Sequence, residues 1–93
     1  MTYLARLVSI TRVSAIPPNI MPFVTFQAQQ RNVELADATE VIVLQVENIP
    51  SYHIFFPKTG ITIEELEKEL AKSDTRLTPE TRGLIGEHLQ KKT

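Results

Sequence analysis

The sequence predicts an α+β fold in which a four-stranded, mainly antiparallel sheet is followed by two C-terminal helices, in the order ββββαα. Runs rich in β-branched and aromatic residues fill the strand-rich part, residues 1–57, and clear helix-start signals lie in the helical part, residues 61–92. A chain of 93 residues suits one hydrophobic core, so we expect a single domain over residues 1–93. A small β-barrel closed by the two helices is the alternative architecture.

The first strand is expected over residues 2–14, where β-branched residues such as Val8 and Ile10 are mixed with polar ones. The alternation is imperfect, because either register places apolar and polar side chains on the same face. A β-bulge near Leu7–Val8 would change the face that the later residues present and would repair the pattern. A bulge at this point is therefore one way to interpret the pattern.

Residues 15–22 contain three prolines, and proline neither donates to a sheet ladder nor fits a central strand. We expect this segment to be a connection. Its apolar residues Ile16, Ile20 and Met21 predict that it packs over an end of the sheet, and the alternative is an exposed lip that binds a partner. Residues 23–29 then alternate between apolar and polar side chains, which predicts a second, half-buried strand before a polar loop.

The clearest strand is expected over residues 40–47, which are apolar on both faces and therefore predict a central strand buried on both sides. A turn at residues 48–51 leads to a last strand over residues 52–56, whose large side chains Phe55 and Phe56 point to opposite faces. If helices cover one face of the sheet, the other face must be covered by a loop, by the proline-rich segment or by another subunit.

The first helix is expected over residues 62–73. Thr62 as N-cap and Glu65 three residues later match a capping box. The second helix is expected over residues 79–91, with Pro79 at its first position. Gly83 and Gly86 lie inside it and each costs about 1 kcal/mol against alanine, so either they permit close approach to the first helix or to a partner, or this end of the chain frays.

Composition excludes several classes of chemistry. The chain has no cysteine, which removes disulfides, thiolate metal ligands and thiol nucleophiles. No signal peptide or membrane span is recognisable, so we expect a cytoplasmic protein with no membrane partner. The net charge is only −1, and residues 1–33 contain three arginines and no acid whereas residues 34–57 contain four acids and no lysine or arginine. We expect neighbouring strands of opposite sign to attract each other.

Residues that could carry chemistry are few, and we expect no catalytic residue, no metal site and no cofactor. The two histidines, His53 and His88, have the carboxylates Glu47 and Glu87 near them in sequence. A small enzyme or ligand binder that uses His53 or His88 is therefore one alternative function. A nucleic-acid-binding regulator is another, and its contacts to a polyanion would be the three arginines of the first 33 residues: Arg6, Arg12 and Arg31.

The leading prediction is a small non-enzymatic protein-interaction module, such as a regulator, inhibitor, adaptor or assembly component, that self-associates as a homodimer. It rests on the apolar proline-rich segment, on the bulk of the last strand and on the lack of a catalytic motif. The partner would be another protein or a second copy of the chain. The residues predicted to bind it are apolar and lie between residues 16 and 56: Ile16, Ile20, Met21, Phe23, Tyr52, Phe55 and Phe56.

Overall fold

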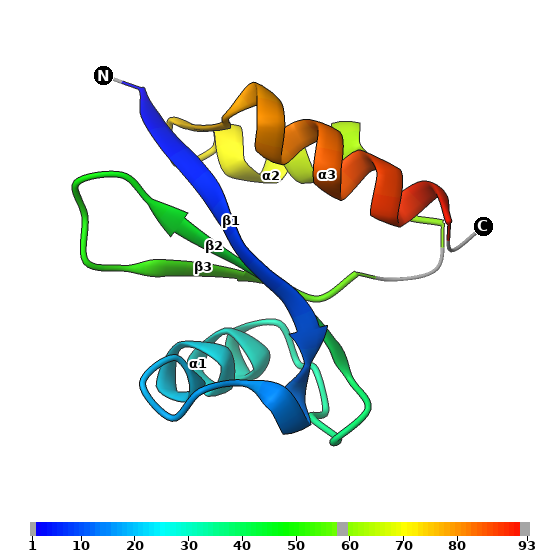
Figure 1. Cartoon of the computed structure of the whole chain (residues 1–93). Helices are drawn as coiled ribbons and strands as arrows, with labels where there is room; N and C mark the ends of the chain where they lie inside the picture. The colour runs from blue at the N-terminus through cyan, green and yellow to red at the C-terminus, as the bar shows by residue number, and fades with distance from the viewer. Residues whose placement is uncertain (1, 58–59, 92–93) are drawn as a thin grey trace.

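The computed structural model describes residues 2–57 and 60–91 (Figure 1). Within them the chain forms an α+β fold with a curled, mixed four-stranded sheet and three α-helices. The elements in chain order are β1 (Tyr3–Arg12), the short 3₁₀ helix η1 (Val13–Ala15), α1 (Met21–Gln30), β2 (Glu40–Val46), β3 (Tyr52–Phe55), α2 (Ile63–Ala71), β4 (Thr75–Leu77) and α3 (Pro79–Gln90).

The strands lie in the order β3-β2-β1-β4. β1 pairs antiparallel with β2, β2 pairs antiparallel with β3, and β4 pairs parallel with the start of β1. The prediction of a central strand over residues 40–47 is confirmed, because β2 has a neighbouring strand on each side and its residues 41–44 are fully buried. The predicted bulge is also confirmed, because Leu7 is opposite Leu44 while Ser9 is opposite Val43.

The prediction of a strand over residues 23–29 is wrong, because these residues belong to helix α1. Pro22 lies in the first turn, where proline is favoured, and glutamines, which are good helix formers, follow. The helix buries Val24 and Ala28, which are four residues apart and share a helical face. In so short a run, this spacing also matches every second residue of a strand, so the pattern suited both structures.

The predicted order ββββαα is also wrong at residues 73–77, which were expected to be a connection. Thr75–Leu77 forms the short strand β4 beside Tyr3–Ala5. Asp74, with a φ of 53°, turns the chain from α2 into this strand. Three residues carry too little pattern to predict a strand, and the partner strand lies at the other end of the chain.

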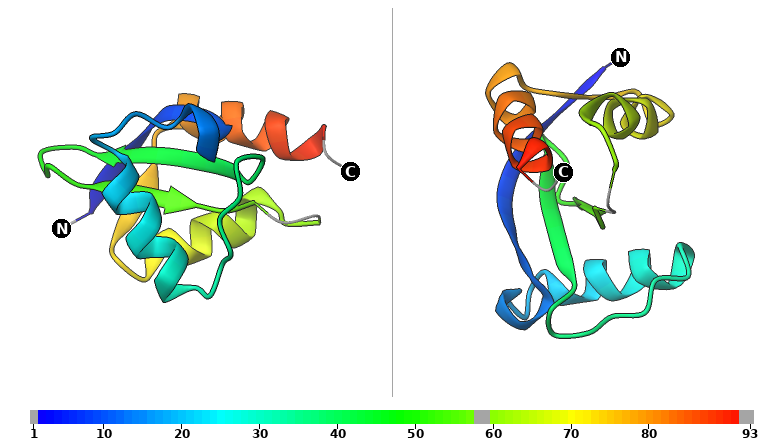
Figure 2. Two further views of the ribbon diagram at one scale, coloured as in Figure 1. Left: turned by 90° about the horizontal axis from the view of Figure 1, so that it is seen from below. Right: turned by 90° about the vertical axis from the view of Figure 1, so that its right-hand side faces the viewer.

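Helices cover both faces of the sheet. Figure 1 shows α2 and α3 above it and α1 below it, and Figure 2 shows the same layers from two further sides. The prediction that the two C-terminal helices lie on one face is confirmed. The other face is covered by α1 and by the proline-rich segment that precedes it, which was one of the three covers expected.

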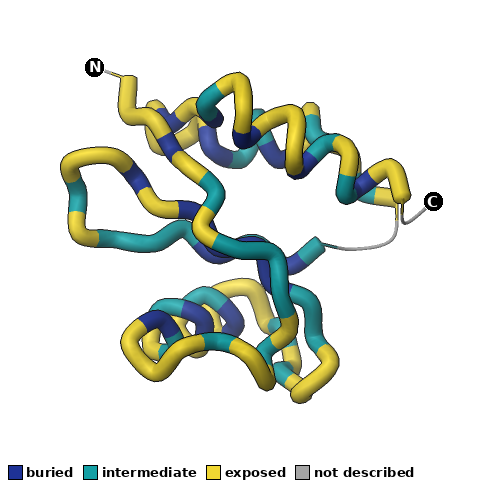
Figure 3. The backbone as a smooth tube through the Cα atoms, in the orientation of Figure 1, coloured by how far each residue is buried: buried dark blue, intermediate teal, exposed yellow. Residues whose placement is uncertain are grey.

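Two hydrophobic clusters result, and successive residues of β2 alternate between them. Figure 3 shows buried residues, in dark blue, on the sheet and on the helices that cover it. The cluster under α2 and α3 contains Ala5, Ile42, Leu44, Leu66, Leu70, Leu77, Ile85 and Leu89. The cluster over α1 contains Ile20, Val24, Ala28, Val41, Val43, Ile54 and Phe56. β2 therefore holds the two halves of the molecule together.

The start signals of both C-terminal helices are confirmed. Thr62 Oγ1 accepts the backbone N–H of Glu65 at 3.3 Å, and Thr78 Oγ1 accepts the N–H of Thr81 at 3.3 Å. A Cβ atom on Gly86 would lie at an ordinary contact distance, 4.0 Å, from the Cβ of Ile63, and one on Gly83 would meet nothing within 4 Å, so neither glycine is required for a close approach between α3 and α2 in the described part of the chain. Among the described residues, no helix has the length and apolar character needed to cross a membrane.

Candidate protein-binding surfaces

The structure divides the predicted partner-binding residues into three groups. Ile20 and Phe56 are buried in the cluster over α1, and Phe23 and Tyr52 pack against the same cluster with their rings edge to face at 5.2 Å. Phe55 is half-buried on the opposite face of the sheet. Ile16 and Met21 behave differently, because they also line a surface groove.

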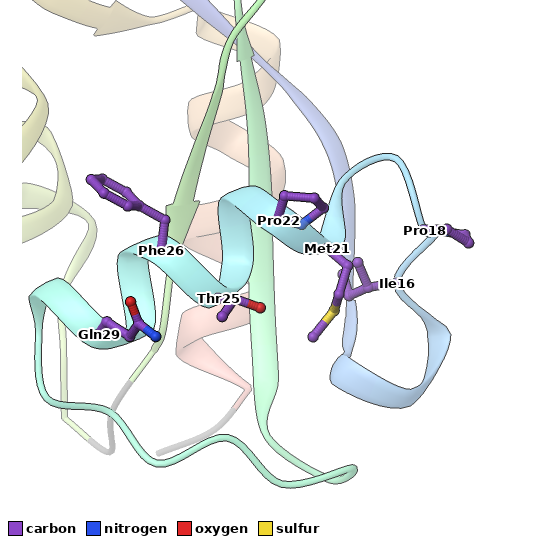
Figure 4. Close-up of a pocket in the computed structure, with 7 residues that line it drawn as sticks. All are labelled: Ile16, Pro18, Met21, Pro22, Thr25, Phe26 and Gln29. Atoms are coloured by element: carbon purple, nitrogen blue, oxygen red, sulfur yellow. The ribbon is translucent and has the colours of Figure 1, made fainter.

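This groove, called here the α1 groove, has a volume of about 670 Å³ (Figure 4). Phe26 is the largest side chain in its lining and is 56% exposed. None of the lining residues carries an ionisable group, and only Thr25 and Gln29 offer polar side chains. All of the lining lies between residues 16 and 29: Ile16, Pro18, Met21, Pro22, Thr25, Phe26 and Gln29.

The prediction missed Phe26 as a surface residue because residues 23–29 were interpreted as a strand. A helical interpretation would have found it. Pro22, Phe26 and Gln29 follow the spacing i, i+4, i+7, which places them on one side of a helix, away from the buried pair Val24 and Ala28. The α1 groove therefore lies on the outward side of α1.

A second candidate surface is the outer edge of β1. The N–H of Thr78 donates to the carbonyl of Ala5 at 3.2 Å, and the N–H of Leu7 donates to Thr81 Oγ1 at 3.0 Å. β4 and the first turn of α3 therefore cover this edge as far as Leu7. Over residues 8–12, no strand in the described part of the chain pairs with it.

A hollow of about 590 Å³ adjoins this edge between β1 and α3. Val8 and Leu84, which are 44% and 48% exposed, both line it. Arg6 and Glu80 also lie in its lining. The apolar side chains of Val8 and Leu84 thus lie beside the part of β1 that no described strand pairs with on this side.

The histidines do not come together. Nε2 of His88 on α3 lies 2.7 Å from Oε1 of Glu40 at the start of β2, a contact that spans 48 positions in sequence. His53 lies on β3, where burial lowers the pKa of its imidazole below the usual value and the positive charge of Arg31 lowers it further. Within the described ranges, no group of three or more side chains of the metal-ligating kind could hold an ion.

The carboxylates that sequence proximity suggested for the histidines pair with other residues. Glu47 lies 3.5 Å from Arg6, and Glu87 lies 3.5 Å from Lys91. The His88–Glu40 contact had no signal in the sequence, because the register of β2 and the position of α3 bring the two residues together.

The three arginines do not form one basic surface. Arg6 pairs with Glu47, and Arg31 lies 3.5 Å from Glu69 with its guanidinium 5.8 Å from the centre of the Phe55 ring. Arg12 is exposed on β1, and Arg31 lies beside β3 at the opposite edge of the sheet. A polyanion would meet two arginines that are already paired with carboxylates.

Comparison with known proteins gives the family. Residues 3–89 match the model of a domain of unknown function, DUF749. The chain belongs to this family. It is also similar to the uncharacterized protein MJ0858 of Methanocaldococcus jannaschii, with 27% identity over 90 residues that cover 96% of this chain and 80% of that protein. No solved structure matches the DUF749 chain.

Proposed function

We propose that this DUF749 chain is a small protein-interaction module, of the regulator, adaptor or assembly-component kind, that binds an apolar segment of a partner protein in the α1 groove. The observation that carries the proposal is the exposure of Phe26 in the same apolar hollow that Ile16 and Met21 line. A contiguous apolar hollow on the surface of a small domain is typical of a protein-binding site, whereas single exposed apolar residues are ordinary.

The lining indicates the chemistry of the partner. A charged side chain placed in the α1 groove would lose its hydration without meeting an opposite charge, which is costly. Apolar side chains would instead replace the water on Phe26 and Met21. Thr25 and Gln29 would supply hydrogen bonds to the backbone or polar groups of the partner. The expected occupant is therefore an uncharged, apolar polypeptide segment.

The shape of the α1 groove favours a polypeptide over a small molecule. One stretch of chain, residues 16–29, forms the whole lining, and no second element of the described part of the chain lines it. Small ligands bind in clefts that bury most of their surface, whereas an apolar segment needs only one open groove. This argument supports a partner protein as the occupant.

A display selection of random 12-residue peptides on the immobilised chain would test the proposal. We expect the enriched peptides to be apolar, and a labelled peptide to shift the backbone NMR signals of residues 16–29. Phe26→Glu should weaken its binding by about tenfold or more, because it places a charge in the apolar groove.

The matched control is Gln30→Glu, which adds the same charge at an exposed position of α1 outside the lining. It should bind as the wild type does. The proposal is wrong if no peptide is enriched, if Phe26→Glu binds as well as Gln30→Glu does, or if the peptide shifts signals elsewhere.

A further inference from the structure

The outer edge of β1 offers free hydrogen-bonding groups over a defined length. Val13 donates its N–H to the carbonyl of Thr39, on the side of β2. Successive N–H groups of an extended strand point to opposite sides, so those of Ser9 and Thr11 also point to β2. Those of Ile10 and Arg12 point away from the sheet. The free segment has Ile10 at its centre, because Thr81 covers the edge at Leu7 and η1 follows Arg12.

This edge is open to the outside of the molecule. Figure 1 shows β1 in front of β2 and β3, with α2 and α3 above and α1 below, and the right-hand view of Figure 2 shows β1 along the outer side of the sheet. Natural proteins commonly protect a free edge with lysine, proline or a covering element, because a free edge pairs readily with another strand. Between Val8 and Arg12 the edge contains neither lysine nor proline.

The side chains around the edge carry complementary charges at its two ends. Arg12 is exposed at one end, and Glu80 is exposed in the hollow beside Val8 at the other end. Neither takes part in an ion pair within the described part of the chain. Arg6 also lies in the hollow, but it pairs with Glu47 of its own sheet.

We propose that two copies of the chain associate by antiparallel pairing of their β1 edges, centred on Ile10, into a continuous eight-stranded sheet. Antiparallel pairing about Ile10 places Arg12 of one copy opposite Val8 of the other, at the distance of a cross-strand neighbour. Arg12 then reaches the hollow that holds Glu80 of the partner copy. Because a twofold axis relates the two copies, this ion pair forms twice, and the edge of one copy is complementary to the same edge of the other.

The helices support the same arrangement. In antiparallel pairing the twofold axis stands perpendicular to the sheet, so both α3 helices lie on one face of the continuous sheet. Leu84 lies with Val8 in the hollow between β1 and α3, which adjoins the free edge of β1. The two Leu84 side chains and the two Val8 side chains would then lie along the seam and lose contact with water. This surface is separate from the α1 groove, so the dimer and the partner-binding proposal can fail independently.

Charge reversal tests the pairing. Sedimentation velocity over a dilution series should show the wild type at twice the 10.5 kDa monomer mass and dissociating on dilution. Arg12→Glu or Glu80→Arg should weaken the dimer by about tenfold or more, because each places like charges together across the seam. The double variant Arg12→Glu/Glu80→Arg should restore association. The matched control Arg76→Glu, an exposed position on β4 outside the seam, should leave it unchanged.

Hydrogen exchange checks the register. In the dimer the amides of Ile10 and Arg12 should exchange slowly at high concentration and quickly on dilution, whereas Val13, bonded within its own chain, should not respond. A chain that stays monomeric at about 100 μM, far above the dissociation constant of a micromolar complex, overturns the proposal. So does a dimer in which Ile10 and Arg12 exchange freely or in which the double variant fails to recover.

Discussion

The hydroxyl oxygen of Thr81 accepts the backbone N–H of Leu7 at 3.0 Å, across 74 positions in sequence. The same oxygen accepts the hydroxyl of Thr78 at 2.8 Å. Thr81 is buried, and its side chain joins the first turn of α3 to β1 at the point where β4 ends and the bulge begins. One threonine thus sets how far the outer edge of β1 is covered.

Thr81→Val should lower the free energy of unfolding by about 1–3 kcal/mol, because valine fills the same space but leaves the N–H of Leu7 without an acceptor. Urea unfolding monitored by circular dichroism would measure it. Thr11→Val is the control, since Thr11 lies on the same strand and no side-chain hydrogen bond joins it to the described residues. Equal losses in the two variants would contradict the role of Thr81.

His53 should make stability depend on pH. Burial, and then the charge of Arg31, lower its pKa in the folded chain, so the unfolded chain binds a proton more readily. The contribution of the neutral His53 to the free energy of unfolding is fully present above the unfolded pKa of about 6.5, and it is lost as pH falls through the folded pKa. The free energy of unfolding, measured as pH is lowered from neutral, should show this decrease in the wild type and not in His53→Gln.

The cause of the His53 shift has its own test. An NMR titration of the His53 ring should give a pKa below the usual histidine value in the wild type, and a partly restored pKa in Arg31→Gln. Burial is the larger cause and remains in that variant, so the restoration should be incomplete. A pKa in Arg31→Gln equal to that of the wild type would remove the arginine from the explanation.

The contact between His88 and Glu40 should couple the last turn of α3 to the start of β2. A double-mutant cycle with His88→Ala and Glu40→Gln should give an interaction free energy of about 1 kcal/mol, because each single change removes the same 2.7 Å contact. Thermal unfolding of the four chains would measure it. Additive losses would show that the two residues act independently.

Local signals predicted much of the fold. The N-cap at Thr62, the buried run of β2 and the bulge at Leu7 each depend on a few neighbouring residues, and the structure contains all three. Two of the residues that line the α1 groove were also singled out from the sequence. The apolar character of Ile16 and Met21 marked the proline-rich segment as one that packs or binds, and it does line the groove.

The failures have a common origin in short or ambiguous runs. Residues 23–29 suit a strand by alternation and a helix by the spacing of Val24 and Ala28, and only the need to cover the second face of the sheet selects the helix. β4 has three residues and forms because α2 returns the chain to the start of β1. The helix in turn places Phe26 on the surface, where the strand interpretation did not reveal it.

The sequence by itself determined the α+β class, the central position of β2, the helix starts and the lack of cysteine chemistry, because each depends on residue type and close spacing. The tertiary structure alone decided which face α1 covers, that β4 joins the sheet, that His88 meets Glu40, and that the edge of β1 is covered only as far as Leu7. These relationships join residues far apart in sequence. They depend on how the packed layers close around one another, which no local pattern records.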